Sequence, residues 1–299
     1  MKSFNSKILL FGEYAVLYRS DALSMPLPMF SGELDFDSTG NSEKQELNKK
    51  LADYFNFLKK NHKRFDYINL TEFEYDLKKG IYFNSSIPQN YGLGSSGALV
   101  AAIFERYQLV GKNLNKNLVN LRAMLQNLES WFHGKSSGID PLVSFLNKTV
   151  VIRNNIPEIV EIGKADEDDF KFFLIDSKQE SSTGFQIRSF QQILKNKMFY
   201  YLFLEKYIPY INSSITFFLE KNHINFDSII FDIVEFQYRY LRILFPSSTR
   251  NLVKEGLEQR SYYLKLCGSG GGGFLLGFTQ DIENTRKLLA EKNVNLIEI

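Results

Sequence analysis

Cysteine is almost absent from this sequence of 299 residues, because Cys267 is the only one. A single cysteine excludes an intrachain disulfide and a metal cluster built on cysteine. Histidine is nearly as scarce, and His62, His133 and His223 are scattered, which argues against a zinc site built on histidine. These absences leave a reducing cytoplasm as the expected compartment.

The sequence also lacks an excess of either charge, since Lys and Arg number 36, Asp and Glu number 34, and the net charge is +2. Such a balance does not indicate a nucleic-acid partner. There is no run of about 20 apolar residues, so no membrane span is expected. Lys7 and Glu13 stand where a signal peptide would need its apolar segment. The hydrophobic content of 44% predicts a globular protein of two domains or one large one.

The most informative stretch is the glycine turn, which we define as residues 92–97. Residues 80–87 are β-branched and aromatic and predict a strand, which Pro88 closes. Residues 98–109 are rich in Ala, Leu and Val and predict a helix. A glycine-rich turn from a strand into a helix favours phosphate binding, because backbone N–H groups and the helix dipole point at the ligand. A tight turn without a ligand is the alternative at this point.

The residues around this turn exclude three known classes of glycine-rich loop. A dinucleotide-binding fold needs an acidic residue about 20 positions further on, and residues 115–121 contain none. The H-R-D and D-F-G strings of protein kinases do not occur. A phosphate loop ending in Gly-Lys-Ser would need a glycine where Glu129 stands.

Three carboxylates occupy positions that can be either solvated or functional. Glu13 follows Gly12 between apolar segments that predict two strands, so it lies in a surface turn or points into a cleft. Glu129 is near the end of a helix predicted over residues 115–132, where the dipole disfavours it unless a cation compensates. Asp140 before Pro141 predicts a helix start with Asp140 as its cap.

The rest of the chain predicts a mixed α+β fold. Residues 64–70 and 73–77 resemble a strand pair, and further strands are expected at residues 23–30, 33–37, 149–153, 159–162 and 170–175. Long helices are expected at residues 185–207, 211–221, 226–245 and 249–260. A domain boundary near the acidic segment at residue 166 divides the chain into residues 1–165 and 166–299.

A second glycine-rich segment, the glycine loop of residues 268–273, lies between strands predicted at residues 262–266 and 274–278. Its apolar flanks distinguish it from a linker. Glycines at these positions allow the backbone to approach a ligand or another loop closely.

Together, Lys7 to Glu13, the glycine turn and the glycine loop resemble the three motifs of the GHMP kinase family, in the same order. The resemblance implies a fold of two α+β domains, the first like the second domain of ribosomal protein S5 and the second ferredoxin-like. It also implies that ATP and a small-molecule alcohol bind between these domains. Among members of the family, the segments from Lys7 to Tyr18 and from Glu129 to Asp140 are most similar to mevalonate kinases, which supply isoprenoid precursors.

The resemblance also implies roles for individual residues. Asp140 would accept the hydroxyl proton as the catalytic base, and Lys7 would steady this carboxylate and the transferring phosphoryl group. Ser96 and Glu129 would hold Mg²⁺, the cofactor used with ATP. The ATP phosphates would bind to Gly92, Leu93, Gly94, Ser95, Ser96 and Gly97. The alcohol would bind near Glu13, Thr183, Gly270 and Gly271, with Thr183 close to Asp140.

Some residues differ from the family pattern and leave the acceptor open. Asn5-Ser6 precede Lys7 where Pro-Gly is usual, and the turn ends Ser95-Ser96-Gly97-Ala98 rather than Ser-Ser-Ala-Ala. Residues 90–97 are also similar to phosphomevalonate kinases, and Ser181 stands where mevalonate kinases often have an arginine. The alternatives are a kinase of phosphomevalonate or a sugar, a decarboxylase of the same fold, and a non-catalytic ligand sensor. The sequence does not decide whether the chain forms a homodimer.

Overall fold

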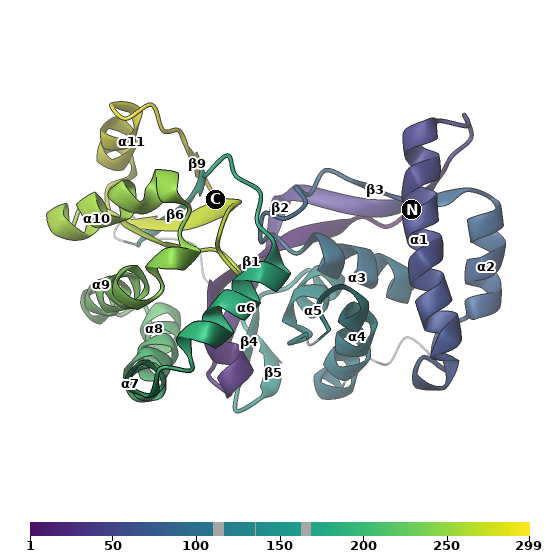
Figure 1. Cartoon of the computed structure of the whole chain (residues 1–299), viewed down its shortest axis with the longest axis horizontal. Helices are drawn as coiled ribbons and strands as arrows, with labels where there is room; N and C mark the ends of the chain where they lie inside the picture. Colours follow the sequence, from purple (N-terminus) through teal and green to yellow (C-terminus); the bar gives the residue numbers. More distant parts are fainter. Residues whose placement is uncertain (110–116, 135, 163–168) are drawn as a thin grey trace. The chain divides into compact units, whose positions relative to one another are not determined.

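The structure is a computed structural model that describes residues 1–109, 117–134, 136–162 and 169–299 (Figure 1). Helices and strands are mixed along the chain, which confirms the α+β class. The chain divides into two compact units. Unit 1 comprises Met1–Lys7, Met25–Pro88 and Gly94–Val150, and unit 2 comprises Ile8–Ser24, Gln89–Leu93 and Val151–Ile299. The boundary predicted at residues 165 and 166 lies outside the described residues.

One sheet has the strand order β1-β2-β4-β5, with β3 paired to β2. Its strands are β1 (Phe4–Phe11), β2 (Ala22–Phe36), β3 (Ile81–Ser85), β4 (Val150–Arg153) and β5 (Ile156–Ile159). β3 runs antiparallel to β2, so that Ile81 lies opposite Phe36. The division between the units falls within β1, between Lys7 and Ile8. Lys7 and Glu13 therefore belong to different units although they are close in sequence.

Unit 1 contains α1 (Ser42–Lys60), α2 (Leu70–Lys78), α3 (Ser95–Tyr107), α4 (Leu118–His133) and α5 (Ile139–Leu146). Helix α3 packs against both α4 and α5. The alanine residues of α3 are all buried, and alanine is the residue that favours a helix most. Aromatic side chains complete this core, and the rings of Phe73 and Tyr107 stack with their centroids 4.5 Å apart.

Unit 2 contains an antiparallel sheet with the order β7-β8-β6-β9. Its strands are β6 (Lys171–Asp176), β7 (Tyr263–Leu266), β8 (Phe274–Thr279) and β9 (Leu296–Glu298). The helices are α6 (Thr183–Ile193), α7 (Lys197–Leu202), α8 (Ile208–Leu219), α9 (His223–Tyr240), α10 (Arg250–Gln259) and α11 (Ile282–Ala290). Phe11, Phe226 and Phe278 form part of the aromatic core. None of the described helices is long and apolar enough to cross a membrane.

The strand pair predicted at residues 64–70 and 73–77 is wrong, because helix α2 occupies Leu70–Lys78. Asn69 caps this helix by accepting a hydrogen bond from the backbone N–H of Glu72 at 3.1 Å. Phe73 and Leu77 then share a helix face, since residues four apart lie on the same side. The local cap and the helical spacing outweigh the aromatic composition that favoured strands.

Other predicted elements are corrected near turns. The second strand expected after Gly12 is a 3₁₀ turn at Ala15–Tyr18, and the two strands expected at residues 23–37 are the single strand β2. The strand expected at residues 159–162 lies earlier, as β5, because Asn154 and Asn155 both have positive φ and make a tight hairpin after β4.

Two helix boundaries also differ from the prediction. The long helix expected at residues 185–207 is interrupted, because Asn196 caps a new helix by accepting from the N–H of Phe199 at 3.1 Å. Asp140 is not the cap of α5, because Gly138 precedes the helix with φ 73° and Asp140 lies in its first turn. The Asp140 carboxylate therefore serves a purpose other than capping.

Candidate functional site

The glycine turn leads into α3 as the sequence predicts, although the helix begins earlier, at Ser95. Asn90, Gly92 and Gly94 all have positive φ, which reverses the chain before the helix. Gly94 is the N-cap, and no side chain caps the first turn. The N–H groups of a first turn have no partner within their own helix, and the helix dipole adds partial positive charge there. The start of α3 therefore has the geometry of an anion site.

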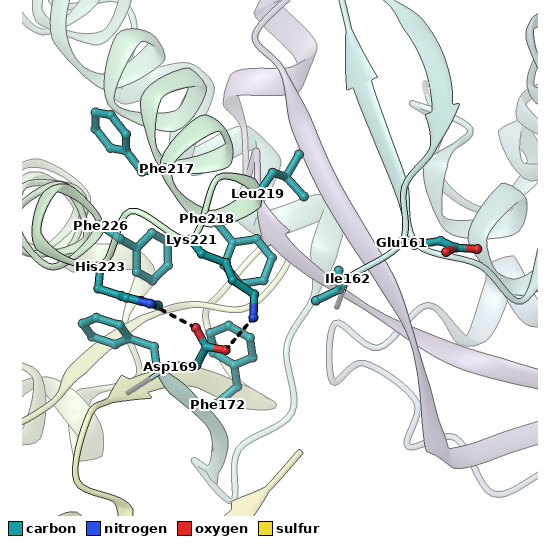
Figure 2. A pocket seen from close by; sticks show the side chains of 11 residues that line it. Glu161, Ile162, Asp169, Phe172, Phe217, Phe218, Leu219, Lys221, His223 and Phe226 are labelled. Carbon is teal, nitrogen blue, oxygen red and sulfur yellow. Dashed lines mark hydrogen bonds and ion pairs between the residues drawn. The ribbon is translucent and has the colours of Figure 1, made fainter. Parts of the chain in front are cut away.

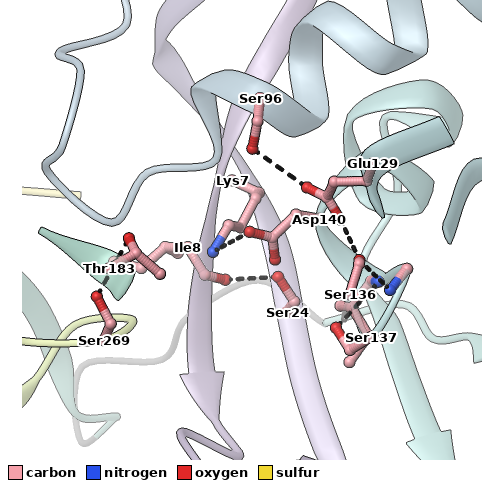
Figure 3. Close-up of polar contacts among 12 residues, drawn as sticks. Lys7, Ile8, Ser24, Ser96, Glu129, Ser136, Ser137, Asp140, Thr183 and Ser269 are labelled. Atoms are coloured by element: carbon pink, nitrogen blue, oxygen red, sulfur yellow. Dashed lines mark hydrogen bonds and ion pairs between the residues drawn. The ribbon is translucent and has the colours of Figure 1, made fainter. Parts of the chain in front are cut away.

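Lys7 and Asp140 form an ion pair in unit 1, with Lys7 Nζ 2.9 Å from Asp140 Oδ2 (Figure 3). The lysine side chain is 3% exposed and the aspartate side chain is 30% exposed. The pair is thus anchored on the lysine side, while the carboxylate stays accessible from solvent. This arrangement suits a group that must meet a substrate hydroxyl.

Two glycines of the turn make room for this ion pair. A Cβ atom on Gly94 would lie 2.8 Å from Cγ and Cε of Lys7. A Cβ atom on Gly97 would lie 2.8 Å from the carbonyl carbon of Asp140 and 2.9 Å from the nitrogen of Pro141. Gly97 therefore permits the close packing of α3 against the first turn of α5.

Glu129 on α4 is buried, and its carboxylate accepts hydrogen bonds from two serine hydroxyls (Figure 3). Ser96 donates at 3.2 Å, and Ser136 donates from the loop before α5. Burial, followed by the negative charge of Asp140, raises the pKa of Glu129 to about 8. The two serines and the Lys7 ammonium act in the opposite direction. A nearby cation would stabilise this carboxylate in its charged form.

The donor set fits a Mg²⁺ ion shared with a nucleotide. Ser96 and Glu129 offer the hard oxygen atoms that Mg²⁺ prefers, and the start of α3 can hold the phosphates that would supply further ligands. Among the described residues there is no group of three or more His, Cys, Asp or Glu side chains that could hold a metal ion. The residues present therefore suit binding of the metal together with the nucleotide and not an all-protein metal cage.

The sequence reading missed the residues that support Glu129. Arg122 Nε donates to the carbonyl of Ser137 at 2.8 Å, and Gln126 Nε2 donates to the carbonyl of Ser136 at 2.6 Å. Arg122, Gln126 and Glu129 have helical spacing and form a polar stripe beside the leucine stripe of α4. That stripe is a signal that could have been found. Lys135, which belongs to the segment from Glu129 to Asp140, lies outside the described residues.

Unit 2 contains a second lysine–carboxylate pair, between Lys265 and Glu13. Both side chains are fully buried. The prediction that Glu13 lies either in a surface turn or in a cleft did not foresee this partner. Lys265 is the one charged residue of the short strand β7 and lies between two buried leucines, so its position could have marked it as a buried ion.

The glycine loop contacts other loops of unit 2. A Cβ atom on Gly92 would lie 2.8 Å from the carbonyl oxygen of Cys267. The Gly271 N–H donates to the carbonyl of Leu244 at 2.6 Å, and the Gly270 carbonyl accepts from the Ser181 hydroxyl. The two glycines predicted to bind the alcohol therefore hold neighbouring loops.

Thr183 begins α6, and its hydroxyl lies 3.5 Å from that of Ser269 in the glycine loop (Figure 3). A threonine at the start of a helix can use its hydroxyl outside the helix. Its predicted place beside Asp140 concerns a residue of the other unit and stays a prediction.

A pocket of about 90 Å³ in unit 2 contains none of the predicted site residues (Figure 2). Its aromatic lining includes Phe172 and Phe218. The Asp169 carboxylate lies 3.4 Å from Lys221 Nζ and 3.4 Å from His223 Nε2. The Asp169 carboxylate is thus paired within the pocket, which distinguishes it from the Glu129 carboxylate.

Residues 56–148 match the family model of the GHMP kinase N-terminal domain. The match includes Gly94 to Gly97, Glu129 and Asp140 and ends before β4. Among curated protein sequences, none matches this chain.

Solved structures resemble nearly the whole chain. Mevalonate kinase of Methanococcus jannaschii is 20% identical, with 99% of this chain and 96% of that chain covered and a TM-score of 0.64. Phosphomevalonate kinase of Streptococcus pneumoniae, in complex with phosphomevalonate and AMPPNP, is 14% identical, with 100% and 99% covered and a TM-score of 0.62. Galactokinase of Lactococcus lactis, complexed with galactose, is 12% identical, with 99% and 92% covered and a TM-score of 0.62. At these identities the similarity is one of fold.

Proposed function

We propose that this chain, whose residues 56–148 match the model of the GHMP kinase N-terminal domain, is a GHMP kinase that transfers the γ-phosphoryl group of ATP to the primary hydroxyl of mevalonate. The observation that carries the proposal is the cluster in unit 1. The Lys7–Asp140 ion pair and the buried Glu129 both contact the glycine turn at the start of α3. Phosphoryl transfer depends on positioning and on neutralisation of charge, which such a cluster can supply.

The start of α3 would bind the nucleotide phosphates. Residues Ser95, Ser96 and Gly97 form its uncapped first turn, where N–H groups and the helix dipole favour an anion. Gly92, Leu93 and Gly94 lead the chain into this turn with positive φ at both glycines. Small residues here let a phosphate approach the backbone.

Asp140 would orient the acceptor hydroxyl and take its proton as the bond to phosphorus forms. Its carboxylate is part-exposed and held at 2.9 Å by Lys7. The same ammonium can stabilise negative charge on the transferring phosphoryl group, since a buried lysine keeps a fixed position and its interactions weaken little through solvent. Neither residue needs to form a covalent bond with the substrate.

Ser96 and Glu129 would hold Mg²⁺, which when bound supplies positive charge for the phosphate oxygens. Their oxygen donors and the raised pKa of Glu129 support this assignment. Ser136 and Gly138 would hold Glu129 in place, because the Ser136 hydroxyl donates to the carboxylate and accepts from the Gly138 N–H at 2.8 Å.

The residues proposed for the acceptor all belong to unit 2. Thr183, Gly270 and Gly271 are proposed to contribute to binding of the acceptor, as the resemblance to mevalonate kinases implies, and the fully buried Glu13 is proposed to contribute indirectly, through its ion pair with Lys265. A phosphomevalonate kinase is the second candidate, because Ser181 occupies the position where mevalonate kinases often have an arginine. In the structure the Ser181 hydroxyl donates to the Gly270 carbonyl, so this position supports the glycine loop and carries no basic group.

The test is ADP release from Mg²⁺-ATP with mevalonate, 5-phosphomevalonate, galactose and homoserine offered separately. We expect turnover with mevalonate and none in Asp140→Asn. Turnover with another acceptor alone would move the substrate assignment and keep the kinase. Binding of ATP without turnover of any acceptor would contradict the proposed kinase reaction and favour a ligand sensor.

A further inference from the structure

Lys265 lies on β7 with its side chain fully buried, and its ammonium has two acceptors. One is the carboxylate of Glu13, and the other is the carbonyl of Leu266 at 2.9 Å. A buried ammonium is strongly destabilising unless it is paired and hydrogen-bonded. Lys265 meets both conditions and connects the turn at residues 12–14 with the last residue of β7.

Leu266 is held on both of its backbone polar groups at the point where β7 enters the glycine loop. Its carbonyl accepts from Lys265, and its N–H donates to Gln237 Oε1 at 2.9 Å. Gln237 in turn donates to the Tyr207 hydroxyl at 2.8 Å, deep in the helical layer of unit 2. The last residue of β7 therefore has its position fixed by side chains from two directions.

The same turn contacts the loop a second time. The Tyr14 hydroxyl donates to the carbonyl of Ser269 at 2.5 Å, and its ring stacks on Phe190 with centroids 4.2 Å apart. Burial, followed by the charge of Glu13, raises the pKa of Tyr14, so its phenol remains a donor. Glu13, through Lys265, thus holds the end of β7, and Tyr14 holds the second residue of the glycine loop.

We propose that Lys265 is a positioning residue that fixes the glycine loop against the turn at residues 12–14. The loop needs such an anchor, because Gly268, Gly270, Gly271 and Gly273 all have positive φ and gain much backbone freedom when released. The consequence for acceptor binding rests on the proposed function, whereas the anchoring itself does not.

The experiment is hydrogen–deuterium exchange on peptides covering residues 267–273. Three backbone N–H groups there report on the loop, because Gly270, Gly271 and Gly273 each donate to a backbone carbonyl. The variant is the double substitution Glu13→Met and Lys265→Met, which removes both charges and keeps unbranched side chains. Replacing a buried ion pair by apolar groups is often neutral for stability, so the variant should fold.

We expect these loop amides to exchange about tenfold faster in the double variant, with exchange in α9 unchanged. The matched control is Lys254→Met with Glu258→Met, an exposed ion pair of the same residue types on α10. Unchanged loop exchange in a folded double variant would overturn the proposal, because Lys265 would then only fill space in the core.

Tyr14→Phe tests the anchor without touching either charge. The substitution removes the hydrogen bond to Ser269 and should accelerate hydrogen exchange in the loop at an unchanged melting temperature. Unchanged loop exchange in Tyr14→Phe would contradict the proposed anchor, and this test is available even if the double variant fails to fold. In the kinase assay Tyr14→Phe should raise KM for the acceptor by about threefold to tenfold at nearly constant kcat. Exchange is measured without an acceptor, so absence of kinase activity would overturn the proposed function and leave this result standing.

Discussion

The two units hold lysine–carboxylate pairs that differ in burial. In unit 1 the Lys7 ammonium is buried, but the Asp140 side chain is 30% exposed. In unit 2 both members of the Lys265–Glu13 pair are fully buried. The same chemical groups are therefore arranged in unit 1 so that a substrate can reach the carboxylate and in unit 2 so that solvent is excluded.

This difference separates a reactive role from a structural one. A carboxylate that acts on a substrate must be reachable, and its partner must be rigid. A pair that is wholly buried is held in one geometry, and removing one member leaves an uncompensated charge. The comparison predicts that the pair in unit 1 governs activity and the pair in unit 2 governs stability and loop position.

The largest expected effect is on activity, from Asp140→Asn. Asparagine has the same shape but cannot accept the hydroxyl proton, so kcat should fall by about 10³-fold. The melting temperature should fall, because the buried Lys7 ammonium loses the Asp140 charge, but less than in Lys265→Met, because the Asp140 side chain is part-exposed. The matched control is Glu105→Gln, which removes an exposed carboxylate paired with Lys2 in the same unit. Full activity in Asp140→Asn would contradict the reactive role that the comparison assigns to the ion pair of unit 1.

The next effect is on stability, from Lys265→Met alone. The Glu13 carboxylate would remain buried without its ammonium partner, which should cost about 3–5 kcal/mol of the free energy of unfolding. Adding Glu13→Met should restore most of this loss. Urea unfolding of the single and double variants measures the loss in the free energy of unfolding and its recovery. Equal stability of the wild type and the Lys265→Met variant would mean that the buried pair is not the structural one.

Much of the site could be predicted because its signals are local. The glycine turn, helix α3 and the acidic residues near α4 and α5 are read from residue types at short spacing. The positions of Glu129 and Asp140 relative to the glycines follow once α3, α4 and α5 pack together. The packing of these helices also explains why position 97 is a glycine, since a Cβ atom there would be too close to the backbone of Asp140.

The features that could not be predicted depend on contacts between residues distant in sequence, or on competition between local signals that favour different secondary structures. Lys265 has meaning only through Glu13, which is 252 positions away. Helix α2 was mistaken for strands because Phe and Tyr favour β structure on average, whereas the Asn69 cap decides the outcome locally. The partner of Lys265 cannot be seen in a window of a few residues, whereas the Asn69 cap lies within one and was outweighed by the average preference of the aromatic residues.

The third prediction concerns Glu129, a buried carboxylate whose pKa is raised to about 8. A group with a raised pKa binds its proton more tightly in the folded state. Its destabilising effect is therefore absent below the unfolded pKa of 4.5 and grows as the pH rises towards about 8. Between pH 6 and pH 8 the loss should be about 2 kcal/mol, from ~1.4 kcal/mol per pH unit while the folded group stays protonated.

Urea unfolding without nucleotide, in a chelator, measures this loss. Glu129→Gln should flatten the pH dependence, while Glu105→Gln should leave it unchanged. An identical pH profile in Glu129→Gln and the wild type would show that this carboxylate does not titrate as its burial requires. A flattened profile in Glu129→Gln would sharpen the comparison, because unit 1 would then contain a buried carboxylate that needs a cation beside one that already has its lysine.

The smallest effect should come from the exposed pair Lys254–Glu258, whose side chains are 55% and 60% exposed at an N–O distance of 3.5 Å. Water screens such a pair, and ordering two long side chains offsets much of the attraction, so Lys254→Met should change the free energy of unfolding by at most about 0.5 kcal/mol. Burial is the main difference from Lys265→Met, because both variants remove a lysine paired with a glutamate in unit 2. If urea unfolding gave the two variants equal losses, burial would not be what separates a structural ion pair from an incidental one.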